Sequence, residues 1–236
     1  MAWSASQIDR LGDRLRNAVT EADLLLLDDY RNSFAEASSH VLTVLRRDFQ
    51  LEPTARPAKS TRAILAKLDR EGTRLSTMQD VAGCRVVVQD RRLQWAHARA
   101  LMDCFPEHRL IDRLARPSHG YRALHLVVKL DGRWVEIQLR TELQHLWAQL
   151  CEQMADRLGA DIKYGGGSPK LRQLLDGLSG AVDVIERREE DPSAIDAQNT
   201  SLAPQLSSSL IALNRQGLRS LLESLGPSID LVLKNE

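Results

Sequence analysis

The hydrophobic pattern predicts helices at the start of the chain. Apolar residues recur at helical spacing in two stretches before residue 50. Ser4 or Ser6 can cap the first helix, and Asp23 is expected to start a second, longer one. The apolar positions that define these two helices are Ile8, Leu11, Leu15, Leu27, Phe34, Val41 and Leu45. Pro53 and Pro57 then interrupt the pattern.

Further along, the pattern predicts strands and helices in turn. A helix opened near Ser60 is followed, after Gly72, by a short buried strand at Val86 to Val88. Residues 91–103 read as a helix and residues 109–113 as a second strand. Thr141 and Gln144 then form a capping box for another helix, which Gly159 ends.

The C-terminal part reads as helical. An amphipathic helix is expected over residues 171–185, then a polar linker over residues 189–204, then a leucine-rich helix to about Leu225. We expect these helices to pack on the core, and an interface for a partner is the alternative.

Residues 118–141 predict a β-hairpin. Two runs rich in apolar and β-branched residues flank Asp131 and Gly132, a dipeptide typical of a two-residue hairpin turn. Side chains alternate between the faces of a strand. One face then carries Leu124, Leu126, Val128, Val135, Ile137 and Leu139. The other carries Tyr121, His125, Glu136, Gln138 and Arg140. This second set resembles the floor of a site more than an ordinary solvated face.

Composition places the chain among ordinary globular proteins. It has 236 residues, of which 43% are hydrophobic and 27% charged, enough for one domain with helical appendages. We expect an α+β fold, with a mixed, largely antiparallel sheet of about five strands and flanking helices.

Charge and cysteines exclude several classes of protein. The formal net charge is zero, which argues against a bulk polyanion binder but permits a local basic patch. No apolar run approaches the ~20 residues of a membrane span, and the start has no signal-peptide core. The three cysteines are widely spaced, so zinc ribbons and disulfide frameworks are disfavoured and a cytoplasmic location is expected.

The helix after Ser60 has a basic side. Lys59, Lys67 and Arg70 fall within one arc, opposite Ile64 and Leu68. Such a stripe is more often a solvated face, while the alternative is a clamp for a polyphosphate. The stripe by itself leaves both readings open.

The order of the motifs carries a resemblance. A basic helix, then DVAGCR, GYRALH and VEIQLRT, then a helix that begins near a Trp-Ala pair, resembles the synthetase domain of the RelA/SpoT alarmone family. The resemblance covers roughly residues 56–165, and the short segment before it is similar to that of small alarmone synthetases without a hydrolase domain. We therefore expect a helical region at 1–52, a nucleotidyltransferase-like synthetase core at 53–167 and a helical region at 168–236.

The resemblance implies a pyrophosphokinase that moves the terminal pyrophosphate of ATP onto the 3′-hydroxyl of a purine nucleotide. It implies Mg²⁺ held by Asp80 and Glu136, with Glu136 also taking the hydroxyl proton. For ATP it implies contacts from Arg56, Lys59, Lys67 and Arg70, and stacking of Arg85 on the adenine. For the acceptor it implies contacts from Tyr121, His125, Arg116 and Gln138, with Tyr121 stacking on the base.

Departures from the family pattern concern mainly the acceptor. Pro117 stands where small synthetases often have a basic residue, and Glu152 replaces a frequent histidine. The acceptor is therefore open between guanosine nucleotides, adenosine nucleotides and the 3′-CCA end of tRNA, as in the toxic branch of the family. That branch implies growth inhibition and a neutralising antitoxin, and relatives imply a homo-oligomer. A silent nucleotide- or RNA-binding module is the alternative from another class.

Overall fold

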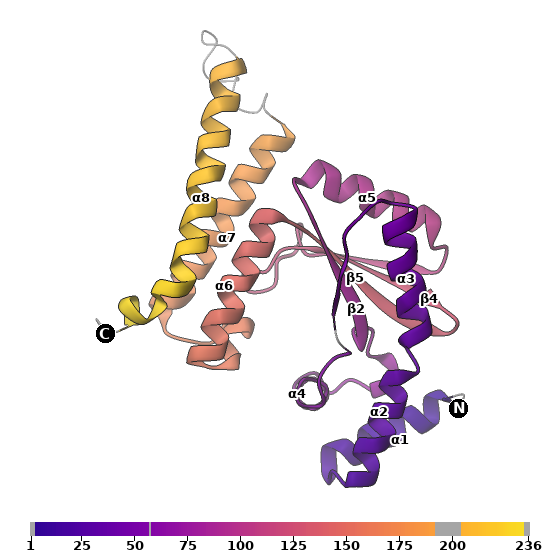
Figure 1. Ribbon diagram of the computed structural model, residues 1–236. Helices are drawn as coiled ribbons and strands as arrows, with labels where there is room; N and C mark the ends of the chain where they lie inside the picture. The colour runs from indigo at the N-terminus through magenta and orange to yellow at the C-terminus, as the bar shows by residue number, and fades with distance from the viewer. Residues whose placement is uncertain (1–2, 57, 192–203, 234–236) are drawn as a thin grey trace. The chain divides into compact units, whose positions relative to one another are not determined.

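The centre of the fold is a five-stranded mixed sheet. The computed structural model describes residues 3–56, 58–191 and 204–233 (Figure 1). The strands are β1 (Thr54–Arg56), β2 (Ala82–Val88), β3 (His108–Asp112), β4 (Leu124–Leu130) and β5 (Arg133–Thr141). Their order is β1-β2-β5-β4-β3, so β5 is the central strand, between β2 and β4. The α+β fold with about five strands is confirmed, and β1, which pairs antiparallel with β2, is a strand that the sequence pattern did not predict.

The hairpin forms at the predicted turn. Asp131 and Gly132 have φ values of 48° and 75°, the positive values that a two-residue turn of this kind needs. The six apolar residues predicted to share one face of β4 and β5 are all buried. The prediction was wrong at the start of the hairpin, because β4 begins at Leu124. Tyr121 instead forms a separate bridge with Ser118.

The chain divides into two compact units. The first unit comprises Met1–Val86, Ala100–Ile111 and His125–Gln138, and the second comprises Val87–Arg99, Asp112–Leu124 and Leu139–Glu236. The boundaries expected near residues 52 and 167 stay a prediction.

The first unit has a helical core beside the sheet strands. Its helices are α1 (Ala5–Asn17), α2 (Glu21–Asn32), α3 (Ala35–Arg47) and α4 (Thr61–Glu71). The side chains of Leu11, Leu27, Ile64 and Leu75 are fully buried in one cluster. Ser4 caps α1 and Ser60 caps α4, as predicted. The regularly spaced apolar residues of α1 and α4 are therefore the ones through which these two helices pack against each other.

The single long helix expected from Asp23 is two helices. It breaks at Ser33 and Phe34, where a turn separates α2 from α3. The Ser33 hydroxyl donates to the Tyr30 carbonyl at 2.6 Å, so it competes for a carbonyl near the end of the helix. Phe34 offers no side-chain cap to α3. The apolar spacing continues across the break, which is why the pattern predicted one helix.

The second unit contains three long helices that pack side by side (Figure 1). They are α6 (Glu142–Leu158), α7 (Pro169–Glu190) and α8 (Pro204–Leu233); α5 (Arg91–Cys104) precedes them in the chain. Leu218 and Leu222 of α8 are buried in the same cluster as Trp147 of α6, so α8 packs on α6 as expected. Most of the predicted linker, residues 192–203, lies outside the described residues. None of the described helices is long and apolar enough to cross a bilayer.

Candidate functional site

Two lysines converge on Asp80 in the first unit. Lys59 Nζ lies 2.5 Å from Asp80 Oδ2, and Lys67 Nζ lies 3.0 Å from Asp80 Oδ1. Lys59 reaches this position because its backbone N–H donates to the Val81 carbonyl at 2.8 Å, beside Asp80. Lys67 projects from α4, the predicted basic helix. The basic side of α4 is thus not simply solvated, because one of its lysines faces a carboxylate.

Glu136 lies at the centre of the sheet, on β5. Its side chain is buried, and three neighbours contact it. His125 Nδ1 lies 2.7 Å from Glu136 Oε1, and the Gln138 amide donates to Oε2 at 2.7 Å. Arg56 Nη1 lies 3.5 Å from the same Oε2. His125 and Glu136 come from adjacent strands, on the face that the alternation predicted.

Gly83 allows Arg56 and Glu136 to meet. Arg56 of β1 pairs directly with Gly83 of β2, the strand that lies between β1 and β5. A Cβ at Gly83 would lie 2.5 Å from the Glu136 carbonyl oxygen and 3.2 Å from the Glu136 Cβ. The glycine of DVAGCR therefore lets β2 and β5 approach. Sequence reasoning missed this role, although a lone glycine in a strand is a signal of close backbone approach.

The remaining ATP-binding candidates are placed differently. Arg70 pairs with its neighbour Glu71 on α4, with 2.8 Å between Arg70 Nη2 and Glu71 Oε1. Arg85 lies on β2, opposite Thr54 of β1, and is partly buried. The structure thus brings together Arg56, Lys59, Lys67, Asp80, His125, Glu136 and Gln138.

Both carboxylates are held in the ionised form. Burial by itself raises the pKa of Asp80, but Lys59 and Lys67 outweigh it and hold that pKa below its ordinary value. Burial likewise raises the pKa of Glu136, while hydrogen bonds from His125 and Gln138 bring it below its ordinary value. The charge of Asp80 also acts on Glu136. This negative charge raises the pKa of Glu136 and so opposes part of the lowering.

These two carboxylates fit Mg²⁺. This ion commonly takes one or two protein carboxylates and completes its shell with phosphate oxygens and water. Among the described residues, no group of three or more His, Cys, Asp and Glu side chains could hold a metal ion by itself. A pair of ionised carboxylates beside two lysines is consistent with an ion that arrives with a phosphate ligand.

Tyr121 belongs to the second unit and sits on a tight turn. Ser118 and Tyr121 exchange backbone hydrogen bonds at 3.2 and 3.0 Å. His119 and Gly120 inside this turn have positive φ values of 51° and 80°. A Cβ at Gly120 would lie 2.8 Å from Trp147 Cζ2, so the turn is pressed against α6. The Ser179 hydroxyl of α7 donates to the Gly120 carbonyl at 2.5 Å.

Arg116, the other acceptor candidate of the second unit, is exposed on the turn after β3. Its backbone N–H donates to the Asp112 carbonyl at 3.3 Å. The Asp112 side chain in turn accepts from two backbone N–H groups of the same turn. Backbone hydrogen bonds thus hold the turn, and Arg116 is exposed on it.

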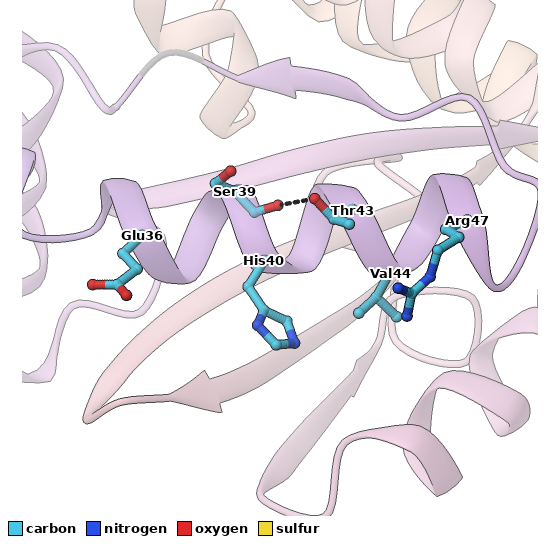
Figure 2. A pocket seen from close by; sticks show the side chains of 6 residues that line it. All are labelled: Glu36, Ser39, His40, Thr43, Val44 and Arg47. Carbon is cyan, nitrogen blue, oxygen red and sulfur yellow. Dashed lines mark hydrogen bonds between the residues drawn. The ribbon is translucent and has the colours of Figure 1, made fainter.

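A hollow of about 430 Å³ lies along α3 (Figure 2). Figure 2 shows the six side chains that line it along the helix: Glu36, Ser39, His40, Thr43, Val44 and Arg47. The Thr43 hydroxyl donates to the Ser39 carbonyl within the helix. None of the predicted site residues lines it. The groups that converge are those around Asp80 and Glu136.

Residues 56–156 match the family model described as a region found in RelA / SpoT proteins. This chain contains a RelA/SpoT domain. The matched range begins at Arg56 and includes Lys59, Lys67, Asp80, Tyr121, His125, Glu136 and Gln138.

Relatives and solved structures agree with the RelA/SpoT domain. An uncharacterized protein of Mycobacterium tuberculosis, Rv1366, is 34% identical over 177 residues, which cover 69% of this chain. The chain spans 62% of the length of that curated relative. The small alarmone synthetase 1 of Bacillus subtilis bound to its product pppGpp matches with a TM-score of 0.54 and 26% identity. That match covers 77% of this chain and all of the other.

A second structure of the same Bacillus subtilis synthetase also has a TM-score of 0.54, with 25% identity. It covers 74% of this chain and 97% of the other. The fold around the RelA/SpoT domain therefore resembles that of small alarmone synthetases.

Proposed function

We propose that this chain transfers the terminal pyrophosphate of ATP to the 3′-hydroxyl of a purine nucleotide, and so makes an alarmone. The observation that carries the proposal is the buried Glu136 carboxylate on the central strand, whose two oxygens are contacted by His125 and Gln138. Two lysines converge on Asp80 in the same unit. The RelA/SpoT domain and the likeness to a synthetase that binds pppGpp support it.

The cationic side chains of the first unit would bind ATP. Lys59 and Lys67 offer two ammonium groups, and Arg56 offers a guanidinium beside Glu136. Such groups suit the spread charge of a triphosphate. Arg85 is proposed to stack on the adenine. Asp80 and Glu136 would hold Mg²⁺, whose bound charge would neutralise phosphate oxygens as the bonds change.

In the chemical step, Glu136 accepts the proton of the acceptor's 3′-hydroxyl. The acceptor's 3′-oxygen forms a bond to the β-phosphorus of ATP, and the bond from that phosphorus to the α,β-bridging oxygen breaks. AMP leaves, and the hydroxyl proton passes to the Glu136 carboxylate. His125 and Gln138 contact both carboxylate oxygens, so they fix its orientation. We therefore propose that Gln138 orients Glu136, in addition to its proposed contact with the acceptor.

The acceptor side rests on Tyr121, with Arg116 and His125. Aromatic stacking accepts any base, so selection needs hydrogen bonds and charge. We place free purine nucleotides ahead of the 3′ end of tRNA, because a formal net charge of zero does not favour a large RNA footprint. We propose the cytoplasm as the place of a reaction that consumes ATP.

The decisive test replaces Glu136 by glutamine. Glu136→Gln keeps the shape and removes the charge that accepts the proton, so transfer of label from γ-labelled ATP to GDP or ADP should fall by about a hundredfold or more. ATP binding should remain. Glu107→Gln is the matched control, because Glu107 pairs with Lys129 at the surface. Near-normal AMP release by Glu136→Gln in the presence of acceptor would show that Glu136 is not the base.

The same assay tests the whole proposal. Wild-type protein that transfers no label to GDP, GTP, ADP or deacylated tRNA, with Mg²⁺ present, would favour a silent binding module. Label found in tRNA that declines steeply with salt would reverse the order of acceptors.

A further inference from the structure

Arg140 is a buried cation of the second unit that the proposed chemistry does not yet use. It lies on β5, and its residue is 3% exposed. A charged side chain is costly to bury unless its hydrogen-bonding groups are satisfied. Its position near the end of a strand, with a long flexible stem, does not require a charge for packing. The buried guanidinium is therefore expected to serve a specific contact.

The guanidinium is directed at the phenol of Tyr121. Arg140 Nη2 donates to the Tyr121 oxygen at 3.0 Å, and Nε donates to the same oxygen at 3.3 Å. The guanidinium carbon lies 5.0 Å from the centre of the ring. The planar fork of arginine suits this double contact, whereas lysine has a single ammonium group. Arg140 therefore holds the ring through two hydrogen bonds and a cation–π contact.

The backbone of Tyr121 is fixed separately. The exchange of hydrogen bonds with Ser118 sets the turn, and Gly120 presses it against Trp147. The indole N–H of Trp147 donates to the Leu175 carbonyl at 2.9 Å, which ties α6 to α7 below the turn. With its main chain set, the freedom left to Tyr121 is rotation of its side chain. Arg140 contacts the end of that side chain and limits this rotation.

We propose that Arg140 is a positioning residue, which by gripping the phenol of Tyr121 fixes the aromatic surface on which the acceptor's purine stacks. This inference rests on the proposed function, because it deepens the role of Tyr121 in that site. The two bonds from Arg140 also use the acceptor capacity of the phenol oxygen.

The test separates acceptor binding from catalysis. Arg140→Lys keeps the charge and loses the fork, and Tyr121→Phe keeps the ring and loses the oxygen. Each should raise the KM for GDP or ADP by about tenfold, the effect of a lost charge-assisted hydrogen bond. The KM for ATP and kcat should change by less than about threefold, since Lys59, Lys67 and Glu136 are untouched. The double variant should be no worse than either single one, because both remove the same contact.

Arg133→Lys is the matched control. Arg133 also lies over aromatic rings, 5.7 Å from the centre of Tyr30 and 5.3 Å from that of Phe34, in the first unit. Its substitution should leave the acceptor KM unchanged. That result would show that losing an arginine–aromatic contact elsewhere in the protein does not raise this KM. Thermal unfolding of every variant is recorded beside the kinetics, so that a loss of fold is recognised. If Arg140→Lys does not fold, Tyr121→Phe carries the test alone.

The results can reject the positioning role of Arg140 without rejecting the proposed pyrophosphate transfer. Wild-type transfer with an unchanged acceptor KM in Arg140→Lys and Tyr121→Phe rejects the positioning role and leaves the proposed function intact. A rise in the KM for ATP equal to that for the acceptor also rejects it. If calorimetry detects no binding of GDP or ADP by wild-type protein, and no transfer occurs, both proposals are rejected.

Discussion

Gly83 lies between Arg56 and Glu136, on the strand that separates theirs. A Cβ added at Gly83 would lie 2.5 Å from the Glu136 carbonyl oxygen, which is closer than real Cβ contacts come. β2 therefore cannot accept a larger residue here without moving from β5. The ionised Glu136 depends in this way on the packing of the strand beside it.

Gly83→Ala should destabilise the protein and reduce pyrophosphate transfer together. Overpacking of this kind costs about 1–3 kcal/mol in the free energy of unfolding, because two backbones must separate. Urea unfolding and the transfer assay measure the two effects. Gly177→Ala is the control, since a Cβ at Gly177 meets nothing and alanine in α7 should stabilise by up to about 1 kcal/mol. Equal stability of Gly83→Ala and wild type would mean that β2 and β5 are not constrained at this point.

At the scale of elements, the end of β5 and the start of α6 are tied to α7 by a buried polar network. The Thr141 hydroxyl and the Gln144 amide both donate to the carboxylate of Glu186, which is 1% exposed. The Gln94 amide donates to the Leu139 carbonyl at 2.8 Å and to the Gln144 side chain. The capping box predicted at Thr141 and Gln144 is thus present, but it also serves a residue some 40 positions further on.

This network makes stability depend on pH. Burial, partly opposed by the bonds from Thr141 and Gln144, raises the pKa of Glu186 to about 7 from an ordinary value near 4.5. The unfolded chain releases this proton more readily, so stability is lost as pH rises from about 4.5 to 7. The full loss is on the order of 3 kcal/mol. Glu186→Gln, which cannot ionise, should therefore be more stable than wild type at pH 8 and no more stable at pH 4.5.

Urea unfolding at the two pH values measures this difference. Glu189→Gln is a suitable control, because Glu189 pairs with Arg215 and lies on the same helix. A gap between wild type and Glu186→Gln that is the same at pH 4.5 and pH 8 would show that Glu186 does not titrate in this range.

At the scale of the whole molecule, α8 completes the helical part of the second unit. Adjacent leucines on this helix differ in burial: Leu222 is 3% exposed and Leu221 is 46% exposed. Leu222→Ala should lower the free energy of unfolding by about 2–5 kcal/mol, since it leaves a cavity against α6. Leu221→Ala should change it by less than about 0.5 kcal/mol. Equal effects of the two substitutions in urea unfolding would mean that α8 does not pack here in solution.

Much of the fold could be read from the sequence, where a physical signal is local. The Asp131-Gly132 turn and the alternation of β4 and β5 predicted the hairpin, and serine caps placed α1 and α4. The break at Ser33 was missed because apolar spacing runs through it. β1 was missed because its three residues are all exposed and show no alternation.

The sequence placed several site candidates on a common face but did not predict the contacts among them. Alternation placed His125 and Glu136 on one face of the hairpin, and their side chains do meet. No sequence pattern tells that Lys59 and Lys67 turn to Asp80 while Arg70 turns to Glu71. Those choices depend on where α4 sits beside the approach to β2, which is a tertiary fact. Gly83 and Arg140 gained their importance in the same way.

The contacts of Asp80 have a consequence for what can enter the site. One carboxylate and two ammonium groups satisfy one another there, so an incoming ligand must break these pairs and replace both signs of charge. A bare polyphosphate would take the lysines and leave Asp80 without counterions, while a bare divalent cation would take Asp80 and leave two ammonium groups facing each other. Under the proposed function, a nucleotide that arrives already bearing its metal ion would satisfy all three groups at once. The anion and the cation would then raise each other's affinity for the site by the same factor.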